Sequence, residues 1–246
     1  MDSDGPMRSQ TAAAEHRAAR IAAAGLASVV DLGCGTGTDL VALARAGLTT
    51  AGVDVDPDAV QAARARLQAA GLGGAVTVAD AVQIDTSPFD VVVLADLTAP
   101  WSFVESLLAR DSCVRLSPDF PRSRVPPGVE AEWVSHHGDL VEVVLWSGRL
   151  ATVSRRATVI GDGGLATLTD EDEPVVAHAA GGLARFLYEA DPAVAGAGLL
   201  PALAAGVRGH VVGGDRPYVA SDHAFHTPYA TSYRVLEEVP LRLEPL

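Results

Sequence analysis

The chain has 246 residues and carries a formal net charge of −13 at pH 7. This length exceeds that of a typical single domain, so we expect one catalytic domain with a smaller appendage. The negative charge argues against a broad nucleic-acid surface, because such surfaces neutralise phosphates with basic residues. Tight arginine pairs occur at 122 with 124 and at 155 with 156, and solvated surface pairs explain them.

Several features predict a cytoplasmic bacterial protein. No apolar run reaches membrane-spanning length, and the N-terminus lacks the basic segment and apolar core of a secretory signal. The cysteines, Cys34 and Cys113, form no recognisable disulfide framework, so we expect two reduced thiols. Every basic residue other than histidine is arginine, which is typical of a GC-rich bacterial genome.

An apolar strand at 29–32 runs into a loop with glycines at positions 33, 35 and 37. Glycines at alternating positions let the backbone approach a ligand closely, while the helix that follows presents free N–H groups to it. The dinucleotide fingerprint G-x-G-x-x-G is spaced differently, because here the third glycine comes one residue early. An ordinary tight turn is the alternative, and three glycines in five residues make it the less favoured interpretation.

Alternating helices and strands follow this loop. A helical stripe ends at Arg45, residues 49–54 form a second strand, and a helix capped by Asp56 runs to Gly71. Asp54 stands about 20 residues beyond the loop, where doubly wound folds place a carboxylate that accepts hydrogen bonds from an adenosine ribose. Because Asp56 caps the helix, we expect Asp54 to remain free for a ligand. A second helix-capping carboxylate is the alternative role for Asp54.

Two further strands end in acidic residues. Residues 75–78 form a third strand followed by Asp80 and Ala81, and residues 89–95 form a buried fourth strand followed by Asp96. Open α/β sheets bind ligands outside the carboxyl ends of their strands. We therefore place Asp80 near an adenine amino group and Asp96 on the substrate side. The alternative is that each carboxylate simply ends its strand in solvent.

The doubly wound pattern extends to about residue 150. We predict a helix over 100–110, a fifth strand over 113–116, a proline-rich lid over 117–128, and a hairpin of strands 130–135 and 140–146. The adjacent His136 and His137 would point to opposite faces of a strand, and no cysteine or third histidine stands nearby. We expect no metal site there.

The region from 151 to 246 has the pattern of an α+β module. We predict a hairpin of 156–160 with 165–168, helices over 179–189 and 192–205, and short strands near 210–212 and 233–239. The hairpin rests on Gly161-Asp-Gly-Gly164, which is the strongest turn signal in the chain.

Residues 9–150 resemble the class I S-adenosylmethionine-dependent methyltransferases, in which five parallel strands are completed by a hairpin carrying one antiparallel strand. A closer resemblance, to bacterial class I methyltransferases with a C-terminal THUMP-like domain, rests on five runs. These are His16-Arg-Ala-Ala-Arg20, Gly128-Val-Glu-Ala-Glu-Trp-Val-Ser135, Gly138-Asp-Leu-Val-Glu-Val-Val-Leu-Trp146, Arg155-Arg-Ala-Thr-Val159 and Tyr188-Glu-Ala-Asp-Pro-Ala-Val194.

The resemblance implies an α/β fold with a doubly wound, Rossmann-like, seven-stranded sheet. It divides the chain into a methyltransferase domain at 9–150 and a THUMP-like α+β accessory domain at 151–246. The implied cofactor is S-adenosyl-L-methionine. We assign its binding to the glycine loop and the strand ends, namely Asp31, Gly33, Cys34, Gly35, Gly37, Asp54, Val55, Asp80 and Ala81.

The implied reaction is direct displacement of the sulfonium methyl by an acceptor, which depends mainly on alignment of the reacting atoms. Asp96 is our catalytic candidate, because its carboxylate can accept a hydrogen bond from an acceptor amine or hydroxyl. The family usually continues this strand with Asp-Pro-Ala-Arg-Arg, whereas here Asp96 leads into Leu-Thr-Ala-Pro-Trp101. A catalytically silent cofactor-binding protein is therefore the alternative function.

The methyl acceptor stays open between RNA and a small molecule. THUMP modules accompany RNA-modifying enzymes, but the sequence has no strong basic patch. We expect no membrane and no metal among the partners. A nucleotide-dependent oxidoreductase is the third alternative, and the spacing at Gly37 argues against it.

Overall fold

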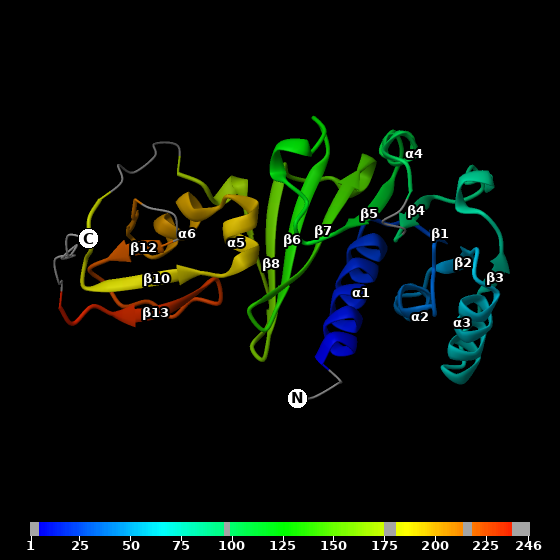
Figure 1. Ribbon diagram of the computed structural model, residues 1–246, viewed down its shortest axis with the longest axis horizontal. Helices are drawn as coiled ribbons and strands as arrows, with labels where there is room; N and C mark the ends of the chain where they lie inside the picture. The colour runs from blue at the N-terminus through cyan, green and yellow to red at the C-terminus, as the bar shows by residue number, and fades with distance from the viewer. Residues whose placement is uncertain (1–4, 96–98, 175–180, 214–217, 238–246) are drawn as a thin grey trace, which may run out of the picture.

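The computed structural model of the chain describes residues 5–95, 99–174, 181–213 and 218–237. Two β-sheets follow one another along its long axis (Figure 1), the larger with nine strands and the smaller with four. The larger sheet contains β1 (Ser28–Leu32), β2 (Thr49–Asp54), β3 (Ala75–Val78), β4 (Val91–Leu94), β5 (Ser112–Leu116), β6 (Glu130–His136), β7 (Asp139–Ser147), β8 (Arg155–Gly161) and β9 (Gly164–Thr169). Their spatial order is β3-β2-β1-β4-β5-β7-β6-β8-β9.

The strands β1 to β5 are parallel, and β1 lies between β2 and β4. The hairpin of β6 and β7 then adds β7 as an antiparallel strand next to β5. The chain order reverses between β1 and β4, which is the switch point where open sheets bind ligands. These seven strands confirm the predicted doubly wound fold, and each lies within two residues of the range expected from the sequence.

The sheet continues beyond the seven predicted strands. β8 pairs in parallel with β6, and β9 pairs antiparallel with β8. The hairpin itself was predicted, but we expected it to open the smaller module rather than to extend the first sheet. Local periodicity indicates a strand without indicating its partner, and a parallel partner lies far away in sequence. The division of the chain at 150 and 151 stays a prediction.

Helices cover both faces of the larger sheet. α1 (Gly5–Ala23) and α2 (Thr38–Arg45) pack on one face, and α4 (Trp101–Leu107) packs on the other. α3 (Pro57–Ala69) packs against α2. It begins where the sequence predicts, because the Asp56 carboxylate accepts a hydrogen bond from the Asp58 N–H at 2.9 Å. Within the described residues, no helix is both long and apolar enough to cross a membrane.

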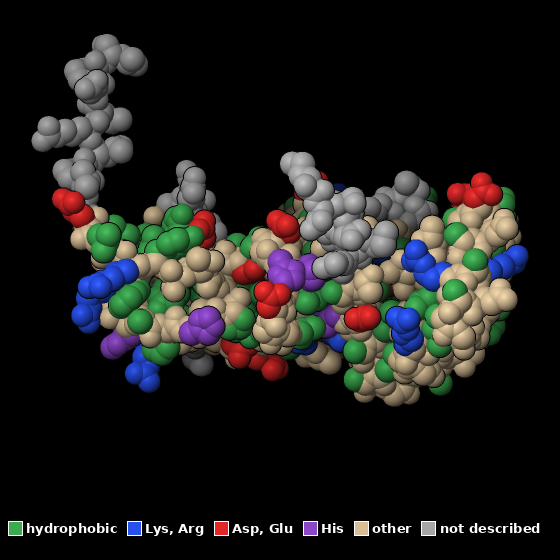
Figure 2. All heavy atoms as spheres, turned by 90° about the horizontal axis from the view of Figure 1, so that it is seen from below, with side chains coloured by type: hydrophobic (Ala, Val, Ile, Leu, Met, Phe, Trp, Pro, Cys, Tyr) green, Lys and Arg blue, Asp and Glu red, His purple; other side chains and the backbone are tan. Residues whose placement is uncertain are grey.

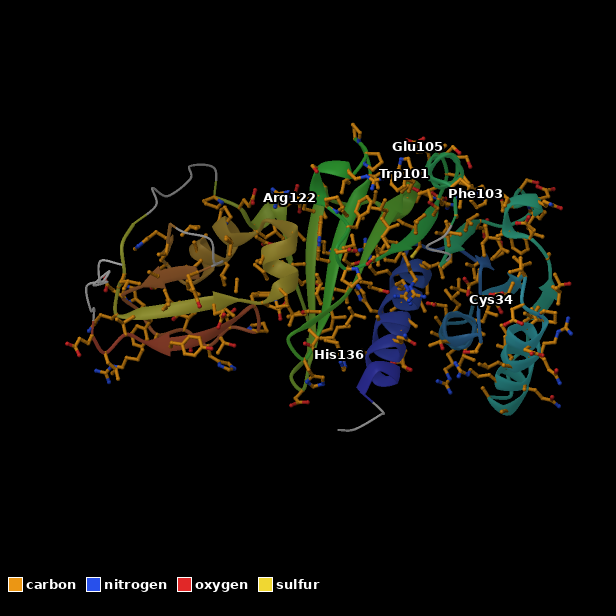
Figure 3. The ribbon with its side chains drawn as sticks, viewed as in Figure 1. Cys34, Trp101, Phe103, Glu105, Arg122 and His136 are labelled. Carbon is orange, nitrogen blue, oxygen red and sulfur yellow. The ribbon has the colours of Figure 1, made fainter. Side chains whose placement is uncertain are left out.

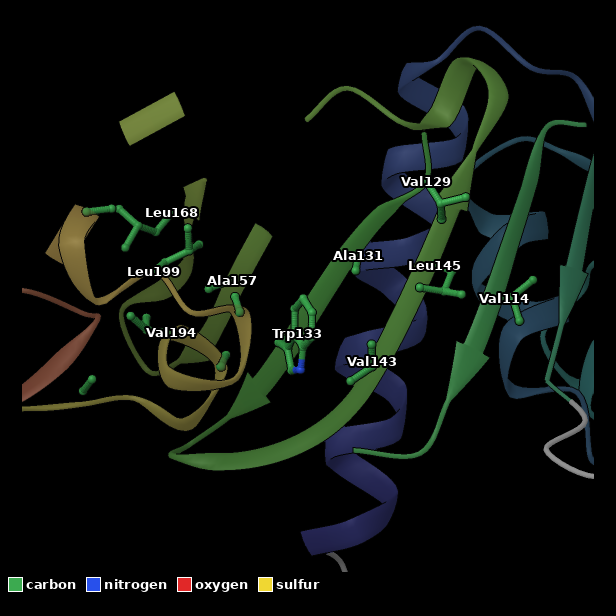
Figure 4. Packing of buried hydrophobic residues seen from close by; sticks show 14 of the residues in the cluster. Val114, Val129, Ala131, Trp133, Val143, Leu145, Ala157, Leu168, Val194 and Leu199 are labelled. Atoms are coloured by element: carbon green, nitrogen blue, oxygen red, sulfur yellow. The ribbon is translucent and has the colours of Figure 1, made fainter. Parts of the chain in front are cut away.

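The hydrophobic core on the α4 face runs without a break into the second unit (Figure 4). Val143 and Leu145 of β7 and Trp133 of β6 form part of it, and Trp133 is 2% exposed. A Cβ atom added to Gly196 would lie 2.5 Å from the Trp133 ring, so only glycine allows the chain to pass this closely. The second unit therefore packs directly against the larger sheet and shares its hydrophobic core.

The smaller sheet contains β10 (Phe186–Ala190), β11 (His210–Val211), β12 (Tyr218–Ser221) and β13 (Ala230–Arg234) in the order β11-β12-β10-β13. Its neighbouring strands are antiparallel. Two short helices, α5 (Pro192–Ala197) and α6 (Leu200–Gly206), lie between β10 and β11 in the chain. α5 packs on β6 and β8, and thereby joins the two sheets (Figure 1).

Three expectations for this second unit need correction. The helix predicted over 179–189 is wrong in its described part, because residues 186–189 belong to a strand paired on both sides, while 179 and 180 lie outside the described residues. The helix predicted over 192–205 is two helices, broken at Gly198, whose φ of +69° ends α5 in the left-handed region. The strand expected over 233–239 runs from 230 to 234, and 238 and 239 are outside the described residues.

Candidate functional site

The carboxyl ends of the central strands are joined by backbone hydrogen bonds at one edge of the larger sheet. The N–H groups of Gly33 and Cys34 both donate to the Val53 carbonyl at 2.9 Å, which ties the loop after β1 to the end of β2. The Ala95 N–H donates to the Leu32 carbonyl at 3.1 Å and ties the end of β4 to β1. This edge at the switch point is where the sequence places the site.

The glycine loop adopts the conformation that its sequence predicts. Gly33, Gly35 and Gly37 all have positive φ, with values of +75°, +51° and +82°. Gly37 is also pressed against α3, since an added Cβ would lie 2.9 Å from the Ala63 Cβ. It caps α2 at its N-terminus. The loop therefore passes tightly between strand and helix and leaves its backbone amides close to the sheet edge.

Asp54 is less free than the sequence suggests. Its Oδ2 accepts a hydrogen bond from the Gly35 N–H at 2.8 Å, and its Oδ1 accepts one from the Asp56 N–H at 3.0 Å. The half-buried carboxylate thus fixes the glycine loop. Each oxygen keeps a second lone pair, so a ligand hydroxyl can still bind. The next residue, Val55, has 69% of its surface exposed, which gives the site an apolar border.

Asp80 and Ala81 lie at the end of β3. The Asp80 carboxylate accepts hydrogen bonds from the Val82 N–H at 3.1 Å and from the Gln83 amide at 3.4 Å, so it caps a single 3₁₀ turn, η1 (Ala81–Gln83). Val78 and Val82 are about half exposed, at 48% and 52%. These valines and Val55 put an apolar surface beside the ends of neighbouring strands.

Asp31 stands out on β1, because its side chain is fully buried and neither carboxylate oxygen has a hydrogen-bond partner among the described residues. It faces the side of the sheet that α1 and α2 cover, opposite to Leu32. Burial, with the negative charges of Asp39 and Asp54, raises the pKa of Asp31 to about 8. Burial likewise raises the pKa of the nearby Cys34 thiol to about 12. The end of β1 therefore holds an unsatisfied carboxyl group, and the glycine loop holds an unreactive thiol.

A closed ring of four charged side chains lies next to Asp31. Arg17 of α1 binds Asp39 at 2.6 Å and also binds Glu142 of β7. Arg115 of β5 binds the same two carboxylates, at 3.0 and 3.1 Å. The two guanidinium groups outweigh burial and hold the pKa of Asp39 below its usual range. Because both arginines are committed to this ring, Asp31 has no cation of its own.

A second charged cluster fastens α1 to β6, farther from the glycine loop. His16 binds the buried Glu132 at 2.7 Å, and Arg20 binds Glu130 at 2.9 Å and Glu132 at 2.8 Å. The Trp146 indole N–H also donates to Glu132, and the Arg20 guanidinium lies 4.2 Å from that ring. These residues belong to the family motifs in the sequence, and their pairing was not predicted, although the spacing of positions 16, 17 and 20 puts them on one helical face.

The catalytic candidate Asp96 lies outside the described residues, as do 97 and 98. Beyond them the chain enters α4 at Trp101, which Figure 3 marks together with Cys34 of the glycine loop. At the opposite tip of the sheet, His136 binds Ser9 of α1 at 3.0 Å. Within the described ranges, no three histidine, cysteine or acidic side chains are grouped to hold a metal ion.

Comparison with known proteins places this geometry in a family. The family model described as a methyltransferase domain matches residues 29–110, which span the glycine loop and the ends of β1 to β4. Residues 29–110 therefore carry a class I methyltransferase domain. The fold is similar to that of a protein from Porphyromonas gingivalis W83, whose crystal structure is described as that of a proposed methyltransferase, with a TM-score of 0.64. Its sequence identity is 20%, and the match covers 86% of this chain and 61% of that one.

Sequence relatives of this methyltransferase fold agree with the assignment. Two proteins from Mycobacterium tuberculosis strains CDC 1551 and H37Rv, described as uncharacterized S-adenosylmethionine-dependent methyltransferases, are 31% identical over 218 residues. The match covers 80% of this chain and 59% of each relative. The ribosomal protein L11 methyltransferase of Dechloromonas aromatica is 42% identical over 74 residues, covering 30% of this chain and 24% of that protein.

Proposed function

We propose that this protein is an S-adenosylmethionine-dependent methyltransferase whose acceptor is RNA or a small molecule. The observation that carries the proposal is the buried Asp31 carboxyl group without a partner, placed beside the glycine loop at the switch point. A buried polar group without a hydrogen bond costs free energy, which a cationic ligand group recovers by binding it. The methionine ammonium of S-adenosylmethionine has the required charge.

The other residues at this edge suit the rest of the cofactor. Asp54 offers its remaining lone pairs to the ribose hydroxyls, and the backbone around Gly35 lies beside it. Val55 gives an exposed apolar surface for the adenine, and Asp80 can accept a hydrogen bond from the adenine amino group. Cys34, with its raised pKa, serves as a small apolar side chain.

The bound sulfonium supplies an electrophilic methyl group. The protein's contribution is to hold the acceptor in line with it, which is mainly a matter of proximity and orientation. Asp96 comes two residues after the end of β4 in the sequence, and we assign its side chain to orienting the acceptor. The segment from Asp96 to Trp101 differs from the family's usual Asp-Pro-Ala-Arg-Arg, and this favours a catalytically silent cofactor-binding protein as the second candidate.

Two further parts of the proposal concern the setting of the enzyme. We assign residues 151–246 as a THUMP-like accessory domain on the strength of motifs such as Tyr188 to Val194, which span β10 and the start of α5. We also assign the protein to the bacterial cytoplasm. The chain matches 59% of the length of the mycobacterial relatives. The remaining parts of those relatives have no counterpart in the alignment, so the activity of the whole chain stays a proposal.

Calorimetric titration with S-adenosylmethionine and S-adenosylhomocysteine tests the cofactor site. Saturable binding is expected in the wild type, and Asp54→Asn should weaken it roughly tenfold, since hydrogen bonds to a charged group contribute about 1.5–3 kcal/mol. Asp162→Asn is the matched control, because this side chain is 99% exposed in the turn between β8 and β9. Absence of binding to both ligands would refute the proposal, whereas binding without transfer to any acceptor pool would favour the silent protein.

A further inference from the structure

Two segments that leave the ligand edge of the sheet meet in an aromatic stack. α4 begins at Trp101, seven residues after the end of β4 at Leu94, and Phe120 comes four residues after the end of β5 at Leu116. The two rings stack with centroids 5.8 Å apart and planes 24° apart. Because β4 and β5 are parallel neighbours, both segments start from the edge at which the glycine loop lies. The stack therefore borders the side from which an acceptor approaches.

An arginine covers this stack. The Arg124 guanidinium lies 5.4 Å from the Trp101 ring centre and 5.6 Å from that of Phe120. Its side chain is exposed, and it makes no ion pair or hydrogen bond within the described part of the chain. Glu105, on the same helix as Trp101 (Figure 3), instead accepts the Trp101 indole N–H at 2.9 Å. Asp119 is exposed and does not pair with Arg124.

Because Arg124 has no ion pair within the described residues, its guanidinium is available to a ligand. A guanidinium group is planar, stacks on aromatic rings, and binds a carboxylate through two parallel hydrogen bonds. Together with two half-buried aromatic rings, such a group suits a ligand that is both flat and anionic.

We propose that Trp101, Phe120 and Arg124 form the wall that holds the methyl acceptor, and that the acceptor is a flat aromatic compound carrying a carboxylate. This inference rests on the proposed methyltransferase function. With a hydroxyl as the reacting group, its oxygen forms the bond to the methyl carbon, the carbon–sulfur bond breaks with its electron pair going to sulfur, and the hydroxyl proton passes to solvent.

RNA is less well suited to this wall. Nucleic-acid binding draws on several phosphate contacts, whereas the chain has a net charge of −13. The face turned away from the wall, shown in Figure 2, likewise carries acidic and basic side chains interspersed. Arg122 and Arg124 share the 3₁₀ turn η2 (Arg122–Arg124), but Arg122 reaches toward Gly198, where an added Cβ would meet its guanidinium. A single guanidinium over aromatic rings matches one carboxylate better than a phosphate chain.

The test uses the full chain saturated with S-adenosylhomocysteine, after binding of that ligand has been measured by itself. The probe is 4-hydroxybenzoate, compared with neutral 4-hydroxybenzamide and with non-planar cyclohexanecarboxylate. Calorimetry should give 4-hydroxybenzoate at least tenfold higher affinity than either comparison compound. Tryptophan emission gives a second readout: Trp133 and Trp146 are buried at 2% and 0% exposure, so quenching by the probe reports Trp101.

Two variants test whether the preference depends on Arg124 itself or on any nearby arginine. Arg124→Gln should remove the preference for 4-hydroxybenzoate over its amide, and Arg122→Gln, the matched control two residues away, should preserve it. If S-adenosylhomocysteine binds but the benzoate shows no preference, or both variants behave alike, the acceptor wall is refuted while the cofactor site stands. Tighter binding of a single-stranded RNA oligonucleotide than of the benzoate also overturns it. Failure to bind S-adenosylhomocysteine overturns both proposals.

Discussion

Replacing Asp31 by asparagine should stabilise the protein in the absence of ligands, and increasingly so as the pH rises. The Asp31 carboxyl group is fully buried without a partner, and burial raises its pKa to about 8 in the folded protein. In the unfolded chain the pKa of an aspartate is about 3.9. Between these values the folded state holds one proton more than the unfolded state. This group's contribution to stability is therefore complete below pH about 4 and is lost as the pH rises toward 8.

The size of the effect follows from that single proton. A difference of one bound proton changes the free energy of unfolding by about 1.36 kcal/mol per pH unit. Asparagine has nearly the same shape and does not titrate, so its advantage over Asp31 should grow by roughly 2.7 kcal/mol between pH 5 and pH 7. Above pH 8 both states of the wild type are ionised, and the advantage should become constant.

Urea unfolding of both proteins at pH 5, 6, 7 and 8 measures this difference, and the titration of every other group cancels when the two curves are subtracted. Asp39→Asn provides a contrast of opposite sign. Arg17 and Arg115 hold the pKa of Asp39 low. The substitution leaves the buried Arg17 and the half-buried Arg115 with one carboxylate fewer and should destabilise the fold. Parallel curves for wild type and Asp31→Asn, with a constant separation from pH 5 to 7, would show that Asp31 is ionised in the folded protein and refute the reasoning.

Three further predictions concern stability and reactivity. Glu132→Gln should lower the free energy of unfolding by roughly 3–5 kcal/mol in denaturant titrations, since it breaks a buried ion cluster; a loss under 1 kcal/mol would contradict this. Gly37→Ala should weaken S-adenosylhomocysteine binding in calorimetry, because φ is +82° and the added methyl meets Ala63, and unchanged affinity would speak against it. Ellman's reagent should leave Cys34 and Cys113 unmodified until denaturant is added, and fast reaction of either thiol in the native protein would disprove their burial.

The part of the fold that local patterns encode was predicted well. The strands β1 to β5 are short apolar runs bounded by turn residues, and Asp56 with Pro57 marks the start of α3 directly in the sequence. The alternation of these elements also fixes the parallel arrangement, since parallel strands need crossover helices. Local signals were therefore enough to place the first seven strands along the chain, whereas their arrangement in one sheet was expected from the family resemblance.

The second unit was predicted less well, because its partners are distant in sequence. Residues around Tyr188 and Ala190 have apolar spacing that fits a helix or a strand. What selects the strand is pairing with β12 and β13, which come about thirty to forty residues later. Similarly, the break at Gly198 depends on the packing of α5 against Trp133, which no short window contains.

The sequence likewise predicted one part of the candidate site and not the other. The glycine loop and the positions of Asp54 and Asp80 at strand ends follow from sequence spacing, and the structure brings them to one edge. That Asp54 already binds the Gly35 amide, and that Asp31 is left without a partner, could not be predicted. Both facts depend on side chains that converge from separate elements, including Arg17 and its ring of carboxylates.

Two clusters of ion pairs hold the N-terminal helix α1 against the larger sheet, next to the edge that we assign to the ligand. His16, Arg17 and Arg20 lie on one face of α1 and neutralise carboxylates on α2, β6 and β7, which are almost entirely buried. Buried carboxylates are tolerated only when paired, so the sheet and α1 each require the other. Since the Arg17 ring also borders Asp31, the helix determines both the packing of the sheet face and the charge environment of the carboxyl group that we assign to the cofactor. We therefore expect ligand binding at Asp31 to be coupled to the docking of α1.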